Sequence, residues 1–134
     1  MIAVRQFAPQ VPPAVSAVVR VDSYRLPDLL RRVRQDGAVL IDCRTPDQIA
    51  LRSIPGAVPF DQSKDLHPRL KILFDVGNSA CPNSTCSHAL ALARTLNEDT
   101  PFSAAFYPGG WAEWTTAFPT PYDEPAYLRQ RSLP

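Results

Sequence analysis

The chain has 134 residues, 45% of them hydrophobic and 20% charged, which are the size and composition of one globular domain. Its 14 basic and 13 acidic residues leave a net charge of +1, and this balance excludes a dedicated nucleic-acid binder, which carries a strong basic excess. No run approaches 18 apolar residues, so we expect no membrane-spanning segment. Residues 1–21 lack the continuous apolar stretch of a secretion signal, so we expect a cytoplasmic protein with reduced thiols.

Prolines concentrate near both ends of the chain. Fifteen prolines stand against five glycines, and many of them lie in residues 9–13 and 119–134. Such segments are typical of extended arms. We therefore expect an extended N-terminal arm (1–16), a central domain (17–119) and a Pro-rich C-terminal tail (120–134).

Between the arms, apolar runs alternate with segments of helical spacing. Short apolar runs predict strands at Ala17–Val21, Ala38–Ile41, Ala57–Phe60 and Phe102–Tyr107. Apolar residues at helical spacing occur in Leu26–Arg34, Pro46–Leu51, Ser63–Phe74, residues 85–96 and a segment with Trp111 and Trp114. Strands that alternate with helices indicate a parallel sheet, so the predicted fold class is α/β.

Two segments are more specific than this general pattern. After the apolar run that begins at Val39, the chain reads Asp42-Cys43-Arg44, then a helical turn, then Ile54-Pro55-Gly56-Ala57. The second segment reads Tyr107-Pro108-Gly109-Gly110-Trp111 and continues to Trp114. Either segment alone is a weak signal, but here both occur in order.

Together, the two segments resemble the signature of rhodanese-like domains over roughly residues 19–119. The chain departs from the family pattern at Gln48-Ile49, where Glu-Tyr is usual, and at Arg52-Ser53, where Gly-His is usual. The resemblance implies one domain with a central five-stranded parallel sheet and helices on both faces. It also implies structural support from Asp42, Arg44, Gly109, Gly110 and Trp111.

The resemblance further implies a nucleophilic cysteine at the end of the fourth strand, in a loop that opens a helix. Two positions compete for this place. Apolar content favours Leu70–Phe74 as the strand, which puts Asp75 at the site and makes the domain catalytically inactive. Spacing favours Cys81, about halfway between Ala57 and Gly109, with Val76–Ala80 as the strand. Of the two, we expect Cys81.

The loop after Cys81 is expected to hold its thiolate. An ordinary thiol with a pKa of about 8.5 is only ~3% ionised at pH 7, but backbone N–H groups and the positive end of a helix dipole stabilise the anion. The predicted binding residues are Pro82, Asn83, Ser84, Thr85, Cys86 and Ser87. This loop contains no Arg or Lys, which argues against tight binding of dianionic thiosulfate. Ser87 stands where related phosphatases of this fold require an arginine, which argues against phosphatase activity.

By resemblance, Cys81 predicts a sulfurtransferase. Its thiolate would attack the outer sulfur of a small sulfur donor, form a persulfide, and pass that sulfur to a thiol or protein acceptor. We expect no cofactor and no metal, because Cys81, Cys86 and His88 match no standard zinc spacing. The alternative is a catalytically inactive module that binds a protein partner or senses redox state. Two roles stay open for Cys86, a resolving thiol and a small buried residue. Cys43 is expected to be buried as a small apolar residue.

Overall fold

A parallel sheet forms the centre of the molecule. The computed structural model describes residues 21–77 and 88–131, with side chains described as far as residue 129. Within these residues five strands pair in parallel in the order β1-β5-β4-β2-β3. They are β1 (Asp22–Ser23), β2 (Val39–Asp42), β3 (Val58–Pro59), β4 (Lys71–Phe74) and β5 (Ala104–Phe106). The predicted α/β class and five-stranded parallel sheet are confirmed, whereas the arm at residues 1–16 lies outside the described residues.

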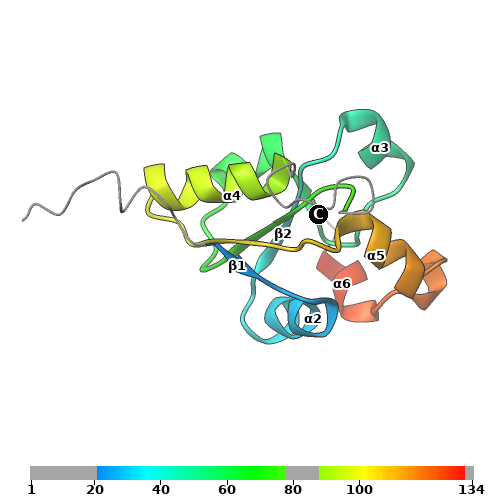
Figure 1. Ribbon diagram of the computed structural model, residues 1–134. Helices are drawn as coiled ribbons and strands as arrows, with labels where there is room; N and C mark the ends of the chain where they lie inside the picture. The colour runs from blue at the N-terminus through cyan, green and yellow to red at the C-terminus, as the bar shows by residue number, and fades with distance from the viewer. Residues whose placement is uncertain (1–20, 78–87, 132–134) are drawn as a thin grey trace, which may run out of the picture.

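Helices cover both faces of the sheet (Figure 1). The helices are α2 (Leu26–Gln35), α3 (Pro46–Leu51), α4 (His88–Asp99), α5 (Gly110–Ala117) and α6 (Ala126–Arg131), with 3-10 turns η2 (Phe60–Asp65) and η5 (Pro121–Asp123). Helices α2, α5 and α6 pack on one face, and α4 packs on the other. In the described part of the chain, none of these helices has the length and apolar character needed to cross a membrane.

The two central strands are buried on both faces because helices cover both sides of the sheet. Successive side chains of a strand point to opposite faces. Leu40 and Phe74 therefore enter the core beneath α2 and α5, whereas Ile41 and Leu73 enter the core beneath α4. All four side chains are at most 2% exposed. This burial fixes where β2 and β4 end, and so fixes the position of the residues that follow them.

Local signals predicted the first half of the chain well. The predicted helix at 26–34 is α2, with Pro27 in its first turn. The predicted helical segment Pro46–Leu51 is α3, which begins with a capping box: the Thr45 hydroxyl accepts from the Gln48 backbone N–H, and the Gln48 side chain accepts from that of Thr45. The apolar run at 38–41 is β2 with both its start and its end shifted by one residue.

Two predicted elements differ from the structure. Within the described residues the first strand is β1 at Asp22–Ser23; of the predicted strand Ala17–Val21, only Val21 is described, and it lies just before β1. The helical spacing within Ser63–Phe74 does not produce a helix, because η2 ends at Asp65 and β4 begins at Lys71. Pro68 lies between them, and proline disfavours helical backbone at the residue before it.

The extended conformation predicted for residues 120–134 is wrong for residues 121–123 and 126–131. These residues form η5 and α6. Leu128 is fully buried in the core beneath α2, and the Tyr127 hydroxyl donates to the Leu30 carbonyl at 3.1 Å. Burial of Leu128 and partial burial of Tyr127 outweigh the preference of the neighbouring prolines for an extended chain.

Candidate functional site

The candidate site lies at the carboxyl ends of β2 and β4. From β2 the chain continues to β3 on one side, and from β4 it continues to β5 on the other. In open α/β sheets, ligands bind where the connections from two neighbouring strands lead in opposite directions along the sheet, as they do here. Asp42 ends β2, and Asp75 directly follows β4.

From the described residues, Asp75 accepts backbone hydrogen bonds of Gly77 and Ala89 at this edge. Its Oδ1 accepts from the N–H of Gly77 at 3.1 Å, and its Oδ2 accepts from the N–H of Ala89, in the first turn of α4, also at 3.1 Å. A carboxylate is stabilised at this end of a helix by the partial positive charge of the unpaired N–H groups. Asp75 therefore joins the end of β4 to the start of α4.

The position of β4 bears on the choice between Asp75 and Cys81 as the residue at the end of the fourth strand. Leu70–Phe74, favoured by apolar content, contains the observed β4, whereas the strand expected at Val76–Ala80 is wrong at Val76 and Gly77, which form a bend and a loop. Residues 78–80 lie outside the described residues, as do Cys81 and the predicted binding residues 82–87. Cys81 thus stays a prediction, and Asp75 occupies the end of the fourth strand.

At the start of α5, Gly110 allows the close approach of the chain that follows β4. Gly110 has a φ of +54°, and a Cβ added there would lie 2.5 Å from the Asp75 carbonyl oxygen. The N–H of Trp111 donates to that carbonyl at 2.9 Å, and the N–H of Ala112 donates to the Val76 carbonyl at 2.8 Å. Only glycine permits this approach at position 110. The Gly109-Gly110-Trp111 segment therefore fixes the backbone that carries Asp75.

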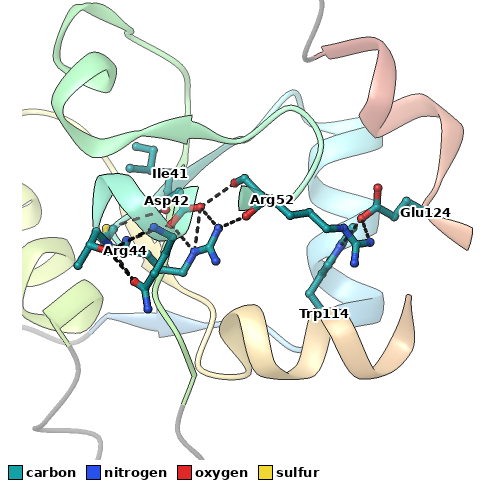
Figure 2. A network of polar contacts seen from close by, with 10 residues as sticks. Ile41, Asp42, Arg44, Arg52, Trp114 and Glu124 are labelled. Atoms are coloured by element: carbon teal, nitrogen blue, oxygen red, sulfur yellow. Dashed lines mark hydrogen bonds and ion pairs between the residues drawn. The ribbon is translucent and has the colours of Figure 1, made fainter. Parts of the chain in front are cut away.

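Asp42 and Arg44 form a buried ion pair at the end of β2 (Figure 2). Their side chains are 0% and 2% exposed. The Asp42 carboxylate accepts from the Arg44 backbone N–H at 3.0 Å, from Nε and Nη2 of its guanidinium, and from the Ser53 hydroxyl at 2.6 Å. The Arg44 guanidinium also lies 4.3 Å from the ring centre of Trp111. This pairing ties the end of β2 to the segment before β3 and to α5.

A second ion pair continues the network to the C-terminal segment. The Arg44 Nη2 donates to the Arg52 carbonyl at 2.6 Å, and the Arg52 guanidinium donates to the Glu124 carboxylate (Figure 2). Glu124, whose side chain is 3% exposed, also accepts from the Trp114 indole N–H at 3.0 Å. Sequence reasoning missed the roles of Arg52, Ser53 and Glu124. The signal that was present was the departure from Gly-His at positions 52 and 53.

Cys43 lies at the same edge of the sheet and is half-buried. Burial, followed by the Asp75 and Asp42 carboxylates, raises the pKa of its thiol from 9.0 to about 12. A thiol with such a pKa is protonated at neutral pH and is a poor nucleophile. Burial and the two carboxylates therefore disfavour Cys43 as the nucleophile of this site.

We expect Cys43 to resist alkylation in the folded protein. The rise in pKa lowers its thiolate fraction near pH 8 by about 1000-fold. Iodoacetamide labelling followed by peptide mapping should show at least ~100-fold slower reaction in the native protein than in urea. The pKa of Cys43 is higher in the folded than in the unfolded protein. Its contribution to the free energy of unfolding is therefore complete below pH 9.0 and is lost as the pH rises towards 12. Equal labelling rates in both states would contradict this assignment.

A cavity of about 470 Å³ opens at this edge of the sheet. Helix α3 lines one side with Pro46, Ile49 and Ala50, and Phe60 and His88 line others. Asp42, Cys43 and Arg44 also reach it. Its size is typical of a ligand pocket, and polar residues, Asp61 and Gln62 among them, share its lining with the apolar ones. In the described part of the chain, no group of three or more His, Cys, Asp or Glu side chains is placed to hold a metal ion.

The comparisons with known proteins agree with this architecture. The model of the family described as Rhodanese-like domain matches residues 26–117. No curated protein matches the chain. Among solved structures, the reduced Bacillus anthracis protein CoADR-RHD is similar, with a TM-score of 0.53 and 22% identity over 74% of this chain and 17% of that one. This likeness shows the fold alone, and this chain spans only a small part of that protein. Because the family model covers more than half of its residues, the chain belongs to the rhodanese-like domain family.

Proposed function

We propose that this rhodanese-like domain is a catalytically inactive module that binds a protein partner. The observation that carries the proposal is the position of Asp75. In active members, as the family resemblance implies, a cysteine ends the fourth strand and backbone amides hold its thiolate. Here β4 ends at Phe74, and the Asp75 carboxylate accepts the backbone hydrogen bonds of Gly77 and Ala89.

The chemistry of a carboxylate supports this proposal. Attack on a sulfur donor needs a polarisable thiolate, and a carboxylate does not form a persulfide. The Asp75 carboxylate lies near Cys43, and its negative charge also opposes the approach of an anion such as thiosulfate, whereas the charge of Asp42 is compensated by Arg44. The cavity between α3 and Phe60, which both apolar and polar side chains line, offers a partner a place to insert a side chain.

Sulfur transfer by Cys81 is the competing hypothesis. It needs a small sulfur donor and a thiol or protein acceptor, and it places the anion-binding amides in residues 82–87. Its support is the position of Cys81 between Asp75 and α4, within the segment that leads into that helix. Both hypotheses are consistent with a cytoplasmic protein, whose thiols stay reduced.

Incubation with thiosulfate or polysulfide, followed by mass spectrometry, separates the two hypotheses. We expect the intact protein to gain no sulfur atom on Cys81 and to produce thiocyanate from cyanide at the same rate as a Cys81→Ala variant. A Cys81→Ser variant serves as a second control, because it keeps the size of the side chain. A sulfur adduct that maps to Cys81, with thiocyanate production lost in both variants, would overturn the proposal in favour of sulfur transfer.

A further inference from the structure

The C-terminal segment 118–131 lies beyond the residues that the family model matches, yet it contacts the candidate site. Glu124 is its central residue. One carboxylate oxygen, Oε2, accepts both from Arg52, before β3, and from the Trp114 indole in α5. The side chain is 3% exposed, so these donors take the place of the water that would otherwise solvate it.

Arg52 connects this segment to the wall of the cavity. Among the described residues, the hydrogen-bond acceptors of its guanidinium are Glu124 and the carbonyls of Phe118 at 3.1 Å and Pro119 at 3.3 Å, all in the C-terminal segment. Its own carbonyl accepts from Arg44 at 2.6 Å (Figure 2). Arg52 directly follows α3, which supplies Pro46, Ile49 and Ala50 to the cavity.

Helix α3 depends on contacts at its ends. It has six residues, and none of its side chains is buried. A helix this short is not stable without tertiary contacts. Its N-terminus is held by the Thr45 capping box, and its C-terminal side is held through Arg52. Arg52-Ser53 stands where the family pattern has Gly-His, and a glycine has no side chain that reaches the C-terminal segment.

We infer that residues 118–131 form a latch that holds the α3 wall of the cavity in place, with Glu124 as the positioning residue. The latch acts through Arg52 on Arg44 and Asp42. Whether the C-terminal segment is bound to Arg52 therefore sets the shape of the cavity. The inference deepens the proposed function, since the cavity is the proposed binding place. Its test needs no ligand, so its failure is distinguishable from failure of that function.

The test compares Glu124→Gln with Asp123→Asn in the full chain. Both variants remove one negative charge from the same segment, but the donor to the Asp123 side chain, among the described residues, is the exposed Thr120 hydroxyl. Hydrogen exchange and two-dimensional NMR report on residues 44–52 and on the two indole N–H signals, which a Trp111→Phe variant assigns. The Trp114 signal reports the direct contact, whereas the Arg44 amide, bonded to Asp42, reports transmission to the site.

We expect Glu124→Gln to speed amide exchange in residues 44–52 by about tenfold, the effect of one charge-assisted hydrogen bond, and to shift the Arg44 amide signal. Exchange in α4 should not change, and Asp123→Asn should behave like the parent protein. Arg52→Met should reproduce the pattern, and it decides the matter if Glu124→Gln does not fold. A shift confined to Trp114, or equal acceleration in α4 and residues 44–52, would overturn the inference.

Discussion

Replacement of Asp75 by cysteine is expected to place a reactive thiol directly after β4, where the chain now has a carboxylate. The introduced Sγ would lie at the end of β4, facing the backbone N–H groups of Gly77 and Ala89 that now bind the carboxylate. Thiols at helix N-termini have pKa values of about 3.5–7.5 instead of about 8.5, because the amides and the helix dipole stabilise the thiolate. An Asp75→Cys variant, made in a Cys81→Ala background, should therefore react with polysulfide and carry one added sulfur atom at position 75.

The pKa of the introduced thiol measures the environment that Asp75 occupies. The pH dependence of iodoacetamide labelling should give a midpoint at least about one unit below that of an ordinary thiol. An Asp75→Ser variant is the matched control, since it presents a hydroxyl of similar size and should take up no sulfur at that position. If the introduced thiol titrates like a free cysteine and stays unmodified, Asp75 does not occupy the anion position of the family.

The parts of the fold that were predicted from sequence are those with strong local signals. Pro27 and the leucines of α2 define that helix, and the apolar run into Asp42 defines β2. The prediction failed where one spacing fits two structures. Leu66, Leu70 and Leu73 match a helix, but the first two lie outside regular helix and strand and the third lies in β4. Tertiary packing of the buried sheet overrides helical spacing here.

The candidate site was predictable only where its residues are close in sequence. Asp42 and Arg44 are two residues apart and belong to one motif, so a local pattern identifies both. Arg52 and Glu124 are 72 residues apart, and neither belongs to a motif that names the other. Their pairing depends on α5 and η5, which place Glu124 beside Trp114. The role of Asp75 could be assigned only once the end of β4 was known. Spacing alone predicted that this strand ends several residues later.

Removal of the Asp42 carboxylate is expected to be the most destabilising single change at this edge of the sheet. An Asp42→Ala variant leaves the Arg44 guanidinium, 2% exposed, without its main partner, and it removes the acceptor of the Ser53 hydroxyl. Loss of one partner of a buried ion pair costs about 3–5 kcal/mol, because the remaining charge is buried and uncompensated. That is a large share of the roughly 5–15 kcal/mol by which domains are stable. Urea unfolding followed by tryptophan fluorescence measures the change in the free energy of unfolding.

The exposed pair Asp28–Arg31 supplies the matched control for this measurement. Its side chains are 50% and 56% exposed, and the two atoms that form it lie 3.0 Å apart, much as in the buried pair. An Asp28→Ala variant should lower the free energy of unfolding by less than about 1 kcal/mol, because water already solvates both charges. Joint replacement of Asp42 and Arg44 by Leu and Met should recover part of the loss, since no charge then stays buried alone. Equal costs for Asp42→Ala and Asp28→Ala would mean that the buried pair does not anchor the end of β2.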